Sequence, residues 1–326
     1  MRSNSNNSSQ TLVLIVPGEG KSLYPLTRRR PQPLVPFGGE FHIIDFTLWN
    51  CLNSDFRKVF VLPDHQAGAV VRYFDSLDWG GEIISVYPDP HKRYGGTADA
   101  LFHNLGLLQL EAPKYVLVLL TDHIYEMDFG KLLEFHTSHG DEITVVTHGI
   151  ADIGVYLFNA SAFRRALLRE ALRAGNSNLS RYVICRSADE CNIRTYDLTS
   201  NARASSTYWG GVDTLDRYYQ TQFRFCGTQD VDRRIISPSV EIAPTASIRN
   251  SIMLRGAQIG RGAHIRKAII EEDVRIPDEA IIGFDEKEDR RRFVVSERGV
   301  VIVDQEGVAR IEDRAWEVIL PQARTA

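Results

Sequence analysis

Apolar residues recur at every sixth position through the last third of the chain. One series runs from Val240 through Ala246 to Ile252. The other series are Ile242, Ile248 and Leu254; Ile259 and Ile265; and Ile270, Ile276 and Ile282. A six-residue period with Gly and Pro at the corners is typical of a parallel β-helix, whose coils bury their inner faces only against neighbouring coils. The sequence therefore predicts a short β-helix of hexapeptide repeats, with a C-terminal extension, over residues 231–326.

The preceding residues alternate between two other patterns. Short, continuously apolar runs begin at residue 11, and the last two occupy 142–150 and 152–159. Continuous apolarity marks strands that are buried on both faces of a parallel sheet. Segments of helical period separate the runs, and the apolar residues from Ala98 to Leu108 lie on one face of a single predicted helix. Residues 11–230 are therefore predicted to form a doubly wound α/β domain that binds ligands at the carboxyl ends of its strands.

Charge and hydropathy limit the classes of partner. The chain has 38 Lys and Arg residues against 42 Asp and Glu residues, and its net charge of −4 provides no overall field for holding nucleic acid. No apolar run approaches the roughly 20 residues of a membrane span, and the start of the chain lacks the apolar core of a secretory signal. We expect a cytoplasmic protein without nucleic-acid or membrane partners. Its first ten residues, rich in Asn and Ser, are expected to form a disordered tail.

A glycine-rich turn follows the first apolar run. It reads Pro-Gly-Glu-Gly-Lys-Ser from Pro17 to Ser22. Glycines allow backbone N–H groups to approach a phosphate closely. The spacing fits neither a Walker loop nor a dinucleotide fingerprint. Taken alone, the turn is equally consistent with phosphate binding and with a simple reversal of the chain.

Several further motifs occur in a specific order. They are PLTRRRPQPLVPFGG (25–39), IIDF (43–46), GGTADA (95–100), TDHIY (121–125) and YWGGVDTLDRYY (208–219). With hexapeptide repeats behind them, they resemble the ADP-glucose pyrophosphorylase family, the glucose-1-phosphate adenylyltransferases of glycogen and starch synthesis. The resemblance covers nearly the whole chain after the tail. It implies a Rossmann-like nucleotidyltransferase domain joined to a left-handed parallel β-helix, usually assembled as a tetramer.

The resemblance also implies the nucleotide half of an active site. In the family, the glycine-rich turn wraps the triphosphate, a Gln and the GTADA segment hold the base and ribose, and the Asp of GDHIY binds Mg²⁺. The matching residues are Gly18, Gly20, Gln66, Gly96, Thr97 and Asp99 for the nucleotide, and Asp122 for the metal. A structural alternative remains open, in which the residues from Gly96 to Asp99 form a turn and a helix cap, and Asp122 is another cap.

Other positions depart from the family pattern. Pro17 stands where the family has its first Gly, and Ser22 stands where it has a catalytic Arg. Lys21 is a weak candidate for the catalytic role, because a Lys is a flexible point charge and does not reproduce a guanidinium fork. Gln32 stands where the next family segment has a Lys, and Gly211 stands where the family has its second metal-binding Asp.

The sugar half of the family site is shortened. The family carries a few tens of residues after the strand that ends near Ile150, including a Glu and a Lys that grip glucose 1-phosphate. Here Ile150 is followed directly by Ala151 and Asp152. We expect the wall of the sugar site to be missing, with the Asp152 anion where a phosphate would approach.

Two basic runs are candidates for effector binding. One contains Arg28, Arg29 and Arg30, and the other contains Arg291. In the family, cationic residues of these two regions come together where anionic metabolites regulate activity. The structural alternative is that each run is a solvated surface.

These features predict a nucleotide-binding, noncatalytic or regulatory subunit with a degraded active site. Its expected ligands are ATP or a related nucleotide with Mg²⁺, and an anionic sugar-phosphate effector. It is expected to form homo-oligomers, or hetero-oligomers with a catalytic homologue. Two alternatives remain open: an active glucose-1-phosphate adenylyltransferase that makes ADP-glucose from ATP and glucose 1-phosphate, and a structural remnant that assembles through the β-helix.

Overall fold

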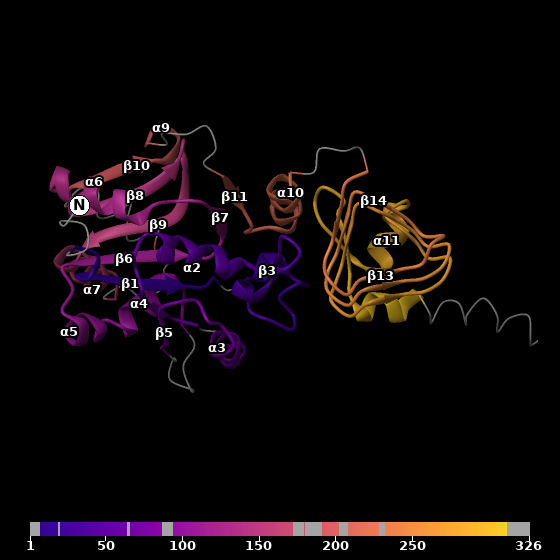
Figure 1. The fold of residues 1–326 in the computed structure, drawn as a ribbon, viewed down its shortest axis with the longest axis horizontal. Coiled ribbons are helices and arrows are strands. Elements are labelled where there is room, and N and C mark those ends of the chain that lie inside the picture. The colour runs from indigo at the N-terminus through magenta and orange to yellow at the C-terminus, as the bar shows by residue number, and fades with distance from the viewer. Residues whose placement is uncertain are drawn as a thin grey trace, which may run out of the picture. The chain divides into compact units, whose positions relative to one another are not determined.

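The computed structural model of the chain forms two compact units (Figure 1). It describes residues 7–18, 20–63, 66–86, 94–171, 179, 191–201, 208–227 and 232–311. The first unit consists of Met1–Lys21, Arg30–Val35 and Ile43–Gly211, and the second of Ser22–Arg29, Pro36–His42 and Val212–Ala326. This grouping by contacts differs from the boundary at residues 230 and 231 expected from the sequence, because two segments from the first fifth of the chain and the residues from Val212 onward group with the repeats.

A seven-stranded sheet forms the centre of the first unit. Its strand order is β10-β8-β9-β6-β1-β4-β5. The strands are β1 (Thr11–Val16), β4 (Lys58–Val61), β5 (Glu82–Ser85), β6 (Tyr115–Leu120), β8 (Ile143–His148), β9 (Ala151–Asn159) and β10 (Ile193–Asp197). The apolar runs thus form the predicted Rossmann-like sheet. One expectation was wrong: β9 is antiparallel to both β6 and β8. It follows β8 after only two residues, and a parallel crossover needs a dozen or more.

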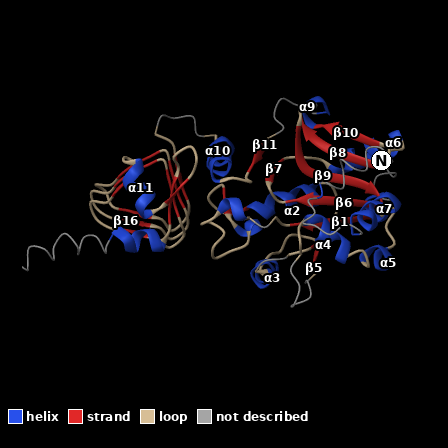
Figure 2. Ribbon diagram, turned by 180° about the vertical axis from the view of Figure 1, so that it is seen from behind, coloured by secondary structure: helices blue, strands red, loops and turns tan. Residues whose placement is uncertain are grey.

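Helices cover both faces of this sheet (Figure 2). Val13 and Ile15 of β1 pack with residues of α2, α3 and α6, whereas Leu12 and Leu14 pack with residues of α4 and α7. The helices are α2 (Ile43–Asn53), α3 (Ala67–Asp75), α4 (Thr97–His103), α5 (Leu107–Glu111), α6 (Phe129–His139), α7 (Ala160–Ala171) and α9 (Leu198–Asn201). This burial on two faces explains the continuous apolarity of the runs.

Two local expectations need correction. The single helix predicted from Ala98 to Leu108 is divided into α4 and α5, and α5 begins after Gly106 as its N-cap. Part of the predicted disordered tail is ordered, because the carbonyl of Gln10 accepts hydrogen bonds from the N–H groups of Lys114 and Tyr115. Residues 1–6 of that predicted tail lie outside the described residues.

The second unit contains the hexapeptide repeats. Its parallel strands form three sheets, in the orders β13-β16-β19, β14-β17-β20 and β12-β15-β18-β22, and β21 pairs antiparallel with β22. The strands are β12 (Arg234–Ile236), β13 (Glu241–Ile242), β14 (Ser247–Arg249), β15 (Ser251–Met253), β16 (Gln258–Ile259), β17 (His264–Arg266), β18 (Ala268–Ile270), β19 (Arg275–Ile276), β20 (Ile281–Ile282), β21 (Val294–Val295) and β22 (Val301–Val303).

The register explains the six-residue period. Ile248 pairs with Ile265, and Ile265 pairs with Ile282, so stacked residues are 17 apart, close to three hexapeptides. A step of about six residues leads from one sheet to the next within a coil, and a step of 17 leads to the next coil. Ile265 and Ile282 are fully buried inside the coils. The predicted β-helix of hexapeptide repeats is confirmed.

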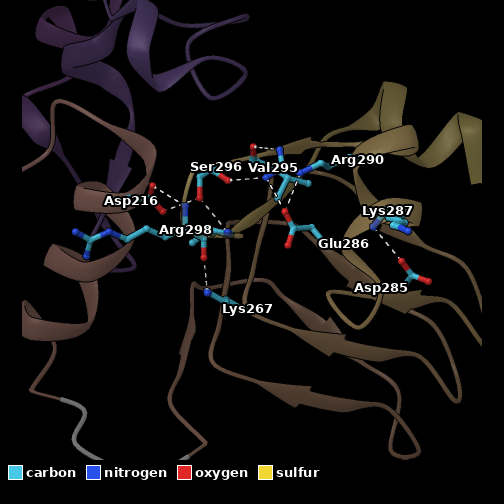
Figure 3. Close-up of polar contacts among 10 residues, drawn as sticks. Asp216, Lys267, Asp285, Glu286, Lys287, Arg290, Val295, Ser296 and Arg298 are labelled. Atoms are coloured by element: carbon cyan, nitrogen blue, oxygen red, sulfur yellow. Dashed lines mark hydrogen bonds and ion pairs between the residues drawn. The ribbon is translucent and has the colours of Figure 1, made fainter.

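Helix α10 (Leu215–Phe225) belongs to the second unit through polar contacts at both ends. Near its start, the Asp216 carboxylate accepts hydrogen bonds from the Ser296 hydroxyl (2.6 Å) and the Arg298 N–H (3.2 Å), as Figure 3 shows. Near its end, the Gln222 side chain accepts from the N–H of Gly38 (2.7 Å). Gly38 lies between the short strands β2 (Pro36–Phe37) and β3 (Phe41–His42), and this bond holds that early segment in the second unit.

The coil packing predicts unequal effects of two glycine substitutions. A Cβ on Gly283 would lie 1.7 Å from the Arg266 carbonyl oxygen, whereas a Cβ on Gly299 would have only the Lys267 amine nearby, at 3.7 Å. Both glycines have positive φ, +84° and +78°. We expect Gly299→Ala to cost about 1–2 kcal/mol from backbone strain alone, and Gly283→Ala to cost roughly 4 kcal/mol or more because backbone must also move.

Urea unfolding followed by circular dichroism measures both variants against the unmodified chain. Gly299→Ala is the matched control, since it has the same backbone strain without the clash. Equal stability of the two variants would contradict the packing of β20 on β17.

Candidate nucleotide site

A cavity opens at the carboxyl ends of β1 and β4 in the first unit. Its unfilled space is about 540 Å³, including a part open to solvent. The residues that line it are Val16, Pro17, Gly18, Pro31, Leu62, Pro63, Val70, Tyr94, Gly96, Thr97 and Ala100. This edge is where ligands bind in open α/β sheets. The structure therefore brings together three of the six predicted nucleotide-binding residues, namely Gly18, Gly96 and Thr97.

The glycine-rich turn forms one wall of the cavity. A Cβ on Gly18 would lie 2.6 Å from Oε1 of Gln32, so any other residue here would require the end of this buried side chain to shift. Gly20 has φ +65°, which also favours glycine. Lys21 is exposed in the short 3-10 helix Lys21–Leu23 and does not line the cavity. Pro17 has no N–H group to offer a phosphate.

The GGTADA segment forms the opposite wall. Gly96 is the N-cap of α4, with φ +129° and ψ −178°, a conformation that only glycine adopts readily. The Asp99 carboxylate accepts a hydrogen bond from the Gly95 N–H (2.8 Å), and the Thr97 hydroxyl accepts one from the Leu179 N–H (3.0 Å). The Asp99 side chain thus holds the turn at Gly95, whereas α4 has no side-chain cap at its start. Gly96 and Thr97 also line the cavity. Gln66 is the N-cap of α3 and does not line the cavity.

Asp122 lies just after β6, as a metal ligand at this edge should. Its Oδ1 is 2.8 Å from Nδ1 of the adjacent His123. His123, in β7 (His123–Tyr125), is paired with Gly211 of β11 (Trp209–Gly211). The position that lacks the second carboxylate therefore lies opposite His123, the residue next to Asp122. The Asp213 carboxylate pairs with Arg217 on α10 (2.9 Å).

These residues do not by themselves form a metal site. Among the described residues, no group of three or more His, Cys, Asp and Glu side chains could hold a metal ion. Mg²⁺ in nucleotide sites is held by one or two carboxylates together with substrate phosphates. Asp122 therefore provides at most one ligand to an ion that a nucleotide brings with it.

Comparison with known proteins agrees with this geometry. Residues 11–153 match the nucleotidyl transferase family, and residues 225–303 match the GlmU-like C-terminal hexapeptide family. The chain is 28% identical to glucose-1-phosphate adenylyltransferase 2 of Alkalilimnicola ehrlichii, over 90% of this chain and 93% of that protein. It is 29% identical to glucose-1-phosphate adenylyltransferase 2 of Vibrio cholerae, over 90% of this chain and 97% of that protein. The chain belongs to the ADP-glucose pyrophosphorylase family.

The segment at which the resemblance implies a longer insertion is a tight β-hairpin in this chain. The alignment with the Alkalilimnicola protein spans 393 positions, more than the 326 residues of this chain, so the relative carries stretches without a counterpart here. Strands β8 and β9 pair up to His148 and Ala151, which leaves only Gly149 and Ile150 as the turn. Gly149 has φ +62°, and its N–H donates to the Asp197 carboxylate (3.1 Å).

The hairpin brings further side chains to this edge of the sheet. The ring of His148 stacks on Trp209, with ring centres 4.7 Å apart, and the ring of His123 stacks on the same indole at 5.7 Å. The Asp152 carboxylate accepts hydrogen bonds from the Gly154 N–H (2.9 Å) and the Tyr156 hydroxyl (2.7 Å). The predicted anion at Asp152 is thus bonded within its own strand.

Several of these residues were not predicted from the sequence. Tyr94 immediately precedes the glycine pair of GGTADA, and Trp209 opens the WGGVD motif, so position beside a motif was an available signal for both. His148 had no such signal, because its contact with Trp209 depends on the two-residue turn.

The predicted effector arginines contact acidic or polar side chains of the chain itself. In the second unit, Arg28 pairs with Asp304 (2.9 Å) and Glu306 (2.7 Å), and Arg29 donates to Gln305 (2.8 Å). Helix α11 (Glu286–Arg292) carries the second run, and there Arg291 pairs with Glu288 at 2.5 Å. The similar pair of Arg290 and Glu286 is drawn in Figure 3. Arg30 groups with the first unit.

The described part of the chain has no helix of the length and apolarity needed to cross a membrane.

The turn of the hairpin makes a pH-dependent contribution to stability. Hydrogen bonds from the Thr199 hydroxyl, and then from the Thr199 and Gly149 N–H groups, lower the pKa of Asp197 from 3.8 to about 2. A carboxyl group with a lowered pKa stabilises the folded state above its ordinary pKa, and this contribution is lost as the pH falls from about 4 towards 2. We expect Asp197→Asn to lose about 1 kcal/mol at neutral pH.

The free energy of unfolding of both proteins, measured in urea between pH 2 and pH 7, checks this expectation. The difference between them should shrink below pH 4. A constant difference across the whole range would show that the carboxylate charge plays no part in holding the turn.

Proposed function

We propose that this chain is a nucleotide-binding member of the ADP-glucose pyrophosphorylase family that does not synthesise ADP-glucose at a useful rate. The observation that carries the proposal is the hairpin of β8 and β9. Its two-residue turn, Gly149 and Ile150, stands where the family resemblance implies a segment whose Glu and Lys grip glucose 1-phosphate. Without such groups, the sugar phosphate lacks the fixed contacts that align it for attack on the α-phosphorus.

The groups that would stabilise the transferring phosphates are also reduced. Ser22 and Gly211 stand where the resemblance implies a cation and a second metal ligand. Lys21 remains as a weak candidate for the catalytic role. Asp122 remains as the single carboxylate proposed to bind the metal. Removing one stabilising group commonly lowers the rate about 100-fold to 1,000-fold, and the losses here concern metal, cation and sugar contacts together.

Nucleotide binding is proposed on separate grounds. Gly18, Gly96 and Thr97 line one cavity at the carboxyl edge of the sheet, with Gly20 in the same turn. Gln66 and Asp99 are proposed to support it, Gln66 from the start of α3 and Asp99 by holding the turn at Gly95. The ligand is proposed to be ATP or a related nucleotide.

Assay of pyrophosphate release tests the loss of synthesis. With ATP, glucose 1-phosphate and Mg²⁺, we expect less than about one thousandth of the rate of a catalytic relative such as the Vibrio cholerae enzyme. Ser22→Arg and Gly211→Asp should each recover less than about tenfold, because groups that act as a unit are strongly non-additive. Robust turnover by the unmodified chain would establish the alternative, an active glucose-1-phosphate adenylyltransferase.

We further propose that the chain assembles with a second copy or with a catalytic homologue. Val240, Ile242 and Ala246 of the first coil are only partly buried, although they continue the inner face that is fully buried at Ile265. Repeats bury their inner faces against neighbours, and terminal repeats need a polar cap or a partner.

Light scattering on the purified chain should give at least twice the mass of one chain if it assembles with itself. If it assembles with a homologue, pull-downs from native cells should contain that homologue. Ile242→Asp should reduce this assembly, whereas Glu241→Gln, on the exposed face of the same strand, should leave it unchanged. A stable monomer without a homologous partner would contradict the proposal.

A further inference from the structure

One segment near the start of the chain contributes to both units. Residues 22–42, which we call the strap, group with the second unit at 22–29 and 36–42 and with the first unit at 30–35. In the middle part, 30–35, Pro31 lines the nucleotide cavity, and the side-chain amide of Gln32 lies beside Gly18 of the glycine-rich turn. A part of the cavity wall is therefore joined, on both sides along the chain, to residues that belong to the second unit.

The flank that precedes the middle part is held by arginines. Arg28 pairs with Asp304 (2.9 Å) and Glu306 (2.7 Å), two residues that follow β22. The adjacent Arg29 donates a hydrogen bond to the Gln305 side chain (2.8 Å). The side chains of Arg28 and Asp304 are 28% and 18% exposed, so water and salt screen this pair less than a fully exposed one. A network of several partners also holds a side chain better than one surface ion pair does.

The flank that follows the middle part is held by α10. The N–H of Gly38 donates to the Gln222 side chain (2.7 Å), and the Tyr218 hydroxyl donates to the Pro36 carbonyl. The ring of Phe37 packs edge-on against the Tyr218 ring, with centres 6.2 Å apart. These contacts carry no charge, whereas those of the first flank are mainly ionic. The first flank can therefore be released by removing charge, while the second flank stays in place.

The middle part is short and stiff. Only two residues separate Arg28 from Pro31, and an extended chain spans at most about 3.5 Å per residue. Pro31 and Pro33 fix their own φ angles and restrict the residues that precede them. Leu34, at the end of the 3-10 helix Gln32–Leu34, is buried in the core of the first unit. Pro31 lies between this anchor and Arg28, so its position at the cavity wall depends on both.

We propose that Asp304 and Glu306 act on Arg28 as a built-in anion, which holds the strap and keeps Pro31 in place for nucleotide binding. The inference rests on the proposed nucleotide-binding function and adds the regulation of that site. A free anion must compete for Arg28 with two carboxylates that are tethered beside it at high effective concentration. The second unit thus sets the nucleotide affinity from within the chain, without an added anionic effector.

Isothermal titration calorimetry of the full-length chain with ATP and Mg²⁺ tests this inference. The double variant Asp304→Asn, Glu306→Gln removes both charges and keeps an acceptor oxygen at each position. We expect its dissociation constant to be at least about threefold above that of the unmodified chain, because Pro31 is no longer pre-organised. The control Glu286→Gln removes an exposed carboxylate that pairs with Arg290 on α11, and it should change the constant less than about twofold.

Three outcomes decide between the inference and the function on which it rests. A change of less than threefold in the double variant would overturn the inference and leave nucleotide binding intact. An equal loss of affinity in the control variant would also overturn it, because any lost carboxylate would then have the same effect. Absence of ATP binding by the unmodified chain at millimolar concentration would overturn the proposed nucleotide binding itself.

A further variant separates the ion pairs from a general loss of stability. Arg28→Gln removes the same contacts from the other side, so it should weaken ATP binding as much as the double variant does. The three substitutions together should weaken it no further, since the interaction is lost only once. Additive losses would contradict the inference. If the double variant does not fold, the ATP affinity of Arg28→Gln against that of the unmodified chain decides.

Amide hydrogen exchange adds a measurement that does not depend on nucleotide. Exchange of residues 22–35 should be faster in Arg28→Gln and in the double variant, whereas that of β1 should stay the same, because only the strap is released. Unchanged exchange in residues 22–35 would contradict the inference, as would an equal increase in β1.

Discussion

The first unit depends on the parallel pairing of β1 with the strands on either side. Leu14 of β1 is paired with Phe60 of β4 and with Val118 of β6, and Val16 is level with Leu120. Because these strands run in the same direction and end together, the segments that follow them emerge at one edge of the sheet. The glycine-rich turn, the Leu62–Pro63 segment and Asp122 are neighbours for this reason, although about 100 residues separate the first from the last. The site is thus a consequence of backbone hydrogen bonds and buried apolar side chains, and it persists even where its polar residues have changed.

Many polar groups near the site and near the predicted effector region are bonded within the chain. Asp99 binds the Gly95 N–H, Asp152 binds Gly154 and Tyr156, and Arg28 binds Asp304 and Glu306. Each of these groups loses part of its capacity to attract a ligand, because a competing partner must be displaced or shared. The exposed ion pairs contribute little to stability individually.

The sequence allowed the strands and repeats to be predicted because both leave a local signal. Continuous apolarity identified β1, β4 and β6, and the six-residue period identified the coils. The composition of β9 does not reveal its direction, but the short spacing between the apolar runs at 142–150 and 152–159 was an available signal, because a parallel crossover needs a dozen or more residues. The grouping of the segment around Gly38 with α10 had no local signal, because it depends on tertiary contacts such as the hydrogen bond from Gly38 to Gln222, which is 184 positions away. In the site, Gly18, Gly96 and Thr97 were found through motifs, whereas Pro31 and Val70 reach the cavity only through tertiary packing.

The pairing of β8 with β9 has a consequence for how chain length varies in this family. His148 and Ala151 are paired across the two strands, so any segment placed between them begins and ends at nearly the same point. The entropy of closing such a loop grows only with the logarithm of its length. A long segment can therefore be gained or removed at this turn while the strand order and both cores of the sheet stay the same. Chain length at this turn can thus change independently of the rest of the domain.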